Sequence, residues 1–131
     1  MKRFLLICSL LFVSSLSLMA QENDENGGNE KIRDKMNEYI QKRLALTDAE
    51  SKKFTPVFLD YFREWRQTLQ TNRGSEKKLE RQQKVAELRL RYRPKFQEVV
   101  GEKRGTRVFD LQDRFMLEMR QVQKNRRNSR P

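Results

Sequence analysis

Two pairs of carboxylates in the sequence have a spacing that could serve acid–base chemistry. Asp110 and Asp113 lie three residues apart, and Asp60 and Glu64 lie four apart, so each pair would share one face of a helix. Arginines flank both pairs, which favours surface ion pairs over a carboxyl with a shifted pKa. The chain has no histidine, the commonest general base. The sequence therefore predicts a protein without enzymatic activity.

The only cysteine, Cys8, falls within the first 20 residues. A lone cysteine cannot form an internal disulfide, and soft-metal sites usually need several cysteine or histidine ligands. The sequence contains no glycine-rich phosphate loop, no serine nucleophile motif and no metal-ligand spacing. We therefore expect no metal and no cofactor.

Residues 1–20 have the pattern of a secretory signal peptide. Lys2 and Arg3 precede an apolar run, and the segment ends on Ala20 before a strongly polar stretch. The run is too short and too rich in serine for the roughly 17–25 apolar residues of a membrane helix, so anchoring is the weaker alternative. We expect export, cleavage after Ala20 and loss of Cys8 with the signal.

Charge is unevenly distributed along the 131 residues. The chain carries 29 Lys and Arg against 18 Asp and Glu, a net charge of +11, which becomes +9 without residues 1–20. Residues 21–60 have a net charge of −2, whereas residues 61–131 have +11. The excess of positive charge in residues 61–131 attracts acidic protein segments, anionic lipid or polysaccharide, and nucleic acid. Export argues against nucleic acid as the partner. The alternative is a solvated helical surface without a partner.

Apolar residues recur with a helical period along the rest of the chain, so we expect an all-α fold of about four amphipathic helices. Residues 21–29 are polar and contain glycine, which predicts a disordered leader. The helical domain is expected over residues 30–124, and the basic residues 125–131 are expected to form a disordered tail. Apolar content is low for a packed monomer, which favours oligomerisation.

Two features define the second predicted helix. Thr47 and Glu50 have the spacing of a capping box, in which each side chain binds the backbone N–H of the other residue. Large rings then recur along one face, which predicts that they pack in an ordinary core. The same residues could in addition form a groove that binds a client protein. Pro56 falls inside this helix and predicts a bend. The apolar residues assigned to the core or to a client face are Phe54, Phe58, Tyr61, Trp65, Leu88, Tyr92 and Phe115.

The third predicted helix, residues 76–93, has two apolar stripes. A helix of this kind contacts two neighbours, either as the central helix of a monomer or at a dimer seam, and both arrangements remain open. The stripes consist of Leu79, Ala86 and Leu90 on one side and Val85, Leu88 and Tyr92 on the other.

Pro94 is expected to end the third helix, with a short helical turn over residues 95–100 before Gly101. The last helix is predicted from Glu102 to about Lys124, with a start weakened by Gly105. Basic residues on these two helices form the predicted partner-binding surface. They are Arg81, Lys84, Arg89, Arg91, Arg93, Arg107, Arg114 and Arg120.

Segments in both halves of the chain match short motifs of a known kind. The first consists of Leu46-Thr47-Asp48-Ala49-Glu50, then Phe54-Thr55-Pro56-Val57-Phe58 and Asp60-Tyr61. It resembles the Leu-Thr-x-x-Gln/Glu motif of the Spy/CpxP-like periplasmic LTxxQ family. The second resembles the branch described as sensors of ECF-type sigma factors and consists of Phe96, Val99-Val100-Gly101-Glu102-Lys103 and Phe115. Glu50 stands where glutamine is usual, and Val-Gly-Glu-Lys replaces a second Leu-Thr-x-x-Gln motif.

The resemblance implies a periplasmic protein of bent helical hairpins in an open cradle, assembled as an antiparallel homodimer. It also implies an ATP-independent chaperone or envelope-stress accessory protein, whose basic surface and modest apolar patches hold unfolded or acidic protein clients. Two alternatives remain open. One is a regulatory partner of a membrane stress sensor or anti-sigma system, and the other is a protein that binds anionic envelope lipid or polysaccharide.

Overall fold

The computed structural model describes the backbone of residues 23–130 and the side chains of residues 27–130. Within this range the prediction of an all-α protein with four main helices is confirmed. The predicted signal peptide, residues 1–20, lies outside the described residues. The helices are α1 (Asn23–Arg43), α2 (Asp48–Thr71), the short 3₁₀ helix η1 (Ser75–Lys77), α3 (Lys78–Val100) and α4 (Glu102–Asn128).

The chain divides into two units, and the boundary lies inside α1, between Ile32 and Arg33. The unit from Arg33 onward contains the end of α1 and all the other helices. Residues 23–29 belong to α1, whereas the sequence predicted a disordered leader over residues 21–29. A polar segment can extend an existing helix because propagation adds a backbone hydrogen bond for each residue fixed.

α2 begins with the predicted capping box, which is confirmed. The Thr47 hydroxyl accepts a hydrogen bond of 3.2 Å from the backbone N–H of Glu50, and the Glu50 carboxylate accepts one of 3.1 Å from the N–H of Thr47. The helix continues through Pro56, which lies on its exposed face. On that face, water can bind the carbonyl group that loses its helical partner.

The aromatic residues of α2 form the centre of the core. The ring of Tyr61 contacts Tyr92 and Phe96 of α3 at centroid distances of 5.4 and 5.8 Å, and Phe109 of α4 at 5.5 Å. The interpretation of this stripe as core is confirmed, since all five rings are buried. They are Phe54, Phe58, Tyr61, Phe62 and Trp65.

α3 continues through Pro94 to Val100, so the predicted helix end before Pro94 is wrong. Pro94 is exposed, whereas Tyr92 and Phe96 on either side of it are buried. These two rings anchor the helix to α2 on both sides of the proline. Their packing outweighs the hydrogen bond that Pro94 cannot donate.

α4 begins at Glu102, and Gly105 is buried within it, so the predicted weakness at its start is wrong. A Cβ atom at Gly105 would lie 2.5 Å from the backbone nitrogen of Gln97 in α3. Only glycine lets the two helix backbones approach this closely. The contact with α3 offsets the low helix propensity of glycine.

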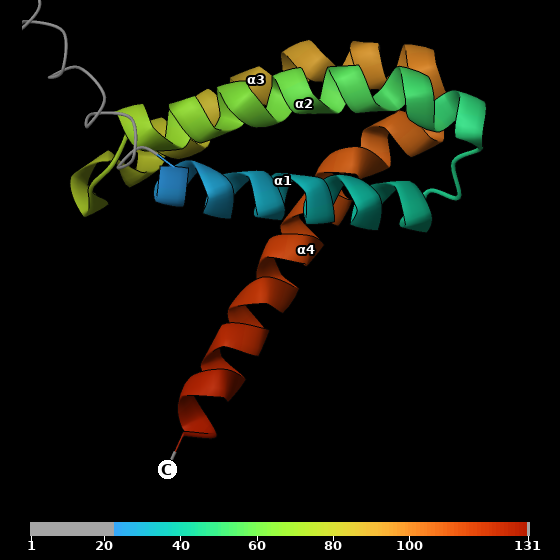
Figure 1. Ribbon diagram of the computed structural model, residues 1–131. Coiled ribbons are helices and arrows are strands. Elements are labelled where there is room, and N and C mark those ends of the chain that lie inside the picture. The colour runs from blue at the N-terminus through green and yellow to red at the C-terminus, as the bar shows by residue number, and fades with distance from the viewer. Residues whose placement is uncertain (1–22, 131) are drawn as a thin grey trace, which may run out of the picture. The chain divides into compact units, whose positions relative to one another are not determined.

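α2 and α3 lie side by side, and α3 leads into α4 at Gly101 (Figure 1). The second half of α4 extends away from them, and every residue from Arg120 to Arg130 is exposed. α4 ends at Asn128, so residues 125–128 of the predicted disordered tail are helical. Among the described residues, no helix has the length and apolarity needed to cross a membrane.

Candidate binding surface

The eight basic residues proposed from the sequence differ in how far they are engaged by neighbours. Arg93, Arg107 and Arg114 are exposed and form no ion pair within residues 27–130. Arg120 is also exposed, and its Nε donates a long hydrogen bond of 3.4 Å to the carbonyl of Met116 in its own helix. Of the eight, these four side chains are the cations that remain available to a partner.

Arg89 instead belongs to a polar cluster defined by Tyr61, Arg89, Gln112 and Asp113. Its guanidinium donates hydrogen bonds of 3.1 and 2.7 Å to the Asp113 carboxylate and one of 2.9 Å to Gln112 Oε1. Its Nε donates to the Tyr61 hydroxyl at 3.3 Å, and Tyr61 in turn donates to Gln112 Oε1. The cluster joins α2, α3 and α4, so Arg89 acts within the fold.

Gln112 is a fully buried polar side chain at the centre of this cluster. Its Nε2 has no hydrogen-bond partner among the described residues, which costs roughly 1–3 kcal/mol for a buried donor. Burial raises the pKa of the Tyr61 hydroxyl, although the charge of Arg89 opposes this shift. Gln112 lies four residues after Val108 and three before Phe115, a spacing that places it on the apolar face.

Arg104 ties together three helix ends. Its guanidinium binds the Glu50 carboxylate through Nη1 and Nη2, and it also donates to the carbonyl groups of Val100, at 2.9 Å, and Leu44, at 3.5 Å. The hydrogen bond from Arg104, followed by that from the Thr47 N–H, lowers the pKa of Glu50. Sequence reasoning identified the capping role of Glu50 but missed Arg104, which lies 54 positions away.

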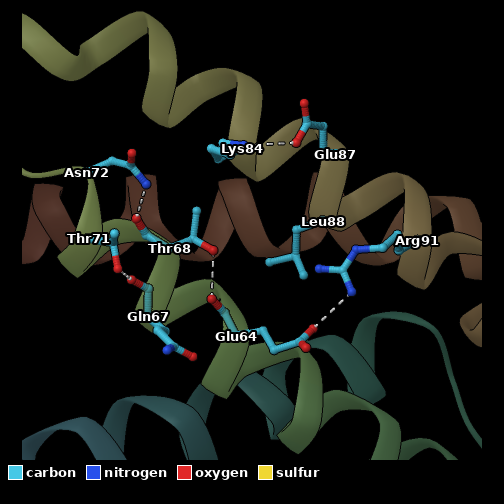
Figure 2. Close-up of a pocket in the computed structure, with 9 residues that line it drawn as sticks. All are labelled: Glu64, Gln67, Thr68, Thr71, Asn72, Lys84, Glu87, Leu88 and Arg91. Atoms are coloured by element: carbon cyan, nitrogen blue, oxygen red, sulfur yellow. Dashed lines mark hydrogen bonds and ion pairs between the residues drawn. The ribbon is translucent and has the colours of Figure 1, made fainter.

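Lys84 and Arg91 both line a hollow of about 450 Å³ between α2 and α3 (Figure 2). Arg91 Nη1 lies 3.7 Å from Glu64 Oε2, and Lys84 Nζ lies 3.7 Å from Glu87 Oε2. The two cations are therefore balanced by two carboxylates. The residues that line the hollow are Glu64, Gln67, Thr68, Thr71, Asn72, Lys84, Glu87, Leu88 and Arg91.

The uncharged polar groups at this hollow bind their own helix. The hydroxyls of Thr68 and Thr71 donate to the carbonyls of Glu64 and Gln67 at 2.8 and 2.9 Å (Figure 2). The hollow is thus close to neutral, with hydroxyls already engaged. It offers little selectivity for an anion.

Arg81 stabilises the turn between α2 and α3. Its Nη1 donates hydrogen bonds of 2.9 Å to the carbonyl of Asn72 and 3.1 Å to that of Gly74. These bonds satisfy carbonyl groups just beyond the end of α2. Arg81, like Arg89, is therefore occupied within the fold.

The two apolar stripes of α3 have different environments. Leu88 and Tyr92 are buried in the core, whereas Leu79 and Leu90 are 79% and 59% exposed. The seven residues assigned to the core or to a client face are all buried. Among the described residues, the large apolar side chains that are exposed lie instead on α3 and α4. They are Leu79, Leu90, Leu117 and Val122.

In the described part of the chain, no three or more acidic, cysteine or histidine side chains are grouped so that they could hold a metal ion. What this surface offers a partner is a set of unpaired arginines beside isolated apolar side chains. Comparison with protein-family models, with curated protein sequences and with solved structures found no match for this chain.

Proposed function

We propose that this chain is an exported, non-enzymatic periplasmic protein that acts as an ATP-independent chaperone. The observation that carries the proposal is the set of unpaired, exposed arginines on α3 and α4, beside leucines that are more than half exposed on the same helices. The resemblance of residues 46–61 to the Spy/CpxP-like family supports it.

The proposed mechanism combines attraction with weak holding. Arg93, Arg107 and Arg114 attract carboxylates of an unfolded client, an interaction that acts over about 10 Å at moderate ionic strength. Exposed side chains of α4 such as Leu117 add small apolar contacts, each of which buries little area. A client held in this way can still fold, because its own apolar groups gain more from packing together.

The proposed assembly is an antiparallel homodimer with the exposed stripe of α3 as its seam. Leu79 and Leu90 lie on the side of α3 opposite the core residues, so a second copy could cover them without disturbing the fold. Light scattering should give a dimer for the mature chain and a monomer for the double variant Leu79→Glu, Leu90→Glu. A wild-type monomer at high concentration would refute this assembly.

Aggregation of a denatured acidic client tests the chaperone proposal. Residues 21–131 should delay aggregation at low salt and lose most of this effect at high salt. The variant Arg93→Gln, Arg107→Gln, Arg114→Gln should lose the effect. Absence of any delay by the wild-type chain would refute the proposal.

A control variant with the same loss of charge removes exposed lysines elsewhere. The variant Lys52→Gln, Lys53→Gln, Lys77→Gln should keep the delay, because these lysines lie on α2 and η1 rather than on α3 and α4. An equal loss of the delay in both triple variants would show that the delay depends on net charge alone, and would contradict a specific role for the three arginines. Recovery of one stoichiometric partner from envelope extracts would favour a regulatory role instead.

A further inference from the structure

Residues 116–130, which comprise the part of α4 beyond Phe115 and the two residues that follow the helix, are termed the α4 arm. At its base the Tyr39 hydroxyl of α1 donates a hydrogen bond of 3.1 Å to Glu118, and every side chain from Arg120 to Arg130 is exposed. The arm carries five cationic side chains and one carboxylate. A largely exposed helical segment of about 13 residues is only marginally stable in water, and repulsion between like charges weakens it further.

Three of these cations form a row on one face of the arm. At 100° per residue, Leu117, Arg120, Lys124 and Arg127 fall within an arc of about 80° and span about 15 Å along the helix axis. None of the three cations forms an ion pair within the described residues. A surface hollow of about 420 Å³ lies along the row and is lined by Arg120, Gln123, Lys124, Arg127 and Asn128.

We propose that this face of the arm is a docking site for an acidic segment of a partner protein. Carboxylates spaced about one helical turn apart would pair with Arg120, Lys124 and Arg127. An apolar side chain of the segment would cover Leu117, which is 62% exposed. The inference rests on the proposed function, since it states where on the basic surface a protein binds and which chemistry it must present.

The chemistry of the row favours a protein segment over a lipid surface. Helices that lie on membranes bury a broad apolar face, whereas the arm has no apolar side chain beyond Val122. Gln123 and Asn128 border the row with amide groups, which can both donate to and accept from peptide groups. The row therefore matches a narrow acidic segment with an exposed backbone.

Charge also argues against a second copy as the occupant. Each copy carries the same cationic row, so the approach of two arms is repulsive. Leu117 by itself buries too little area to overcome this repulsion. The arm is thus a different surface from the stripe of α3 proposed for the homodimer.

The test uses a synthetic helical peptide with glutamates every three to four residues and one leucine, and a second peptide with glutamine at each glutamate. Fluorescence anisotropy at low salt should show binding of the acidic peptide alone. The row variant Arg120→Gln, Lys124→Gln, Arg127→Gln should bind it about tenfold more weakly, as expected for three exposed ion pairs. Leu117→Ser should also weaken binding.

The control is again the variant Lys52→Gln, Lys53→Gln, Lys77→Gln, which should bind the acidic peptide with nearly wild-type affinity. Circular dichroism of both variants checks that the helices are retained. Equal weakening in the two variants would overturn the proposal. Loss of binding to phosphatidylglycerol vesicles in the row variant, without peptide binding by the wild type, would assign the arm to lipid and also overturn it.

This test and the chaperone test fail independently. A wild-type chain that binds the acidic peptide through the row but delays no aggregation would refute the chaperone and retain the docking site. A chain that delays aggregation, but binds the acidic peptide equally well without Arg120, Lys124 and Arg127, would retain the chaperone and refute the docking site. Dissociation of a dimer by the row variant would overturn the docking proposal in favour of self-association.

Discussion

Arg89 and Asp113 form a bidentate ion pair, in which Nη1 and Nη2 of the guanidinium donate hydrogen bonds of 3.1 and 2.7 Å to the two carboxylate oxygens. The contact joins the middle of α3 to the middle of α4. The Arg89 side chain is 22% exposed and that of Asp113 is 63% exposed. Because the cation is the more buried partner, loss of the carboxylate leaves it poorly neutralised.

Asp113→Asn should lower the free energy of unfolding by about 1 kcal/mol, since Arg89 keeps its hydrogen bond to Gln112 but loses a charge-assisted pair that is partly open to water. Urea denaturation measures this difference. Asp110→Asn is the matched control, because Asp110 is exposed on α4 without an ion pair in the described residues. Similar losses for both variants would contradict a specific role for the Arg89 pair.

Gly105→Ala should destabilise the protein by about 2 kcal/mol, although alanine has the higher helix propensity. The added Cβ would lie 2.5 Å from the backbone nitrogen of Gln97, so α3 and α4 must separate. Thermal denaturation followed by circular dichroism measures the change. Gly28→Ala in α1 provides a control of opposite sign, because no atom lies within 4 Å of its added Cβ. A stabilised Gly105→Ala variant would refute the close helix contact.

Stability should fall as the pH rises from about 10 to about 12. Burial, followed by the nearby Glu64 carboxylate, raises the pKa of Tyr92 from its ordinary value of 10.0 to about 12. In this window the unfolded chain loses the Tyr92 proton while the folded chain keeps it, so stability is full below pH 10 and declines above it. Denaturation at a series of alkaline pH values measures the slope.

Tyr92→Phe should make this alkaline slope shallower without abolishing it. Tyr61 and Tyr39 also have pKa values raised by burial, so they retain part of the dependence. Near-ultraviolet absorbance of tyrosinate reports their titration directly. An unchanged slope in the Tyr92→Phe variant would show that Tyr92 titrates normally.

Acid should weaken the junction of Glu50 and Arg104. Because the pKa of Glu50 is lowered in the folded state, its contribution to stability is present above the ordinary value of 4.5 and is lost as the pH falls through the folded value. Glu50→Gln keeps an acceptor for the cap but should flatten the acid slope. Glu38→Gln removes the exposed pair with Lys42 and should have a smaller effect. A larger effect at Glu38 would contradict this assignment.

The fold class, the capping box and the aromatic core could be predicted because each depends on local spacing. Thr47 and Glu50 interact across a single turn, and the rings of α2 recur at the helical period. The continuation of α3 through Pro94 could not be predicted, because it depends on Tyr92 and Phe96 packing against residues of α2 far away in the sequence. Local propensity gives the wrong result where distant packing decides.

The basic surface was predicted only in outline for the same reason. The sequence shows that Arg89 and Arg93 are cations on one helix, but not that Asp113 and Gln112 bind the first and leave the second exposed. Gln112 itself had a usable signal, since a polar residue on an apolar stripe indicates a buried partner. Arg104 had none, because its partners lie at the ends of other helices.

The long-range hydrogen bonds of Arg104 also indicate the order in which parts of the chain fold. Its bonds to Glu50 and to the Leu44 carbonyl join positions 54 and 60 residues apart, so they form only after α2, α3 and the start of α4 have come together. Interactions that form late contribute mainly to the barrier against unfolding. Truncation of Arg104 should therefore shorten the lifetime of the native state while leaving the refolding rate nearly unchanged.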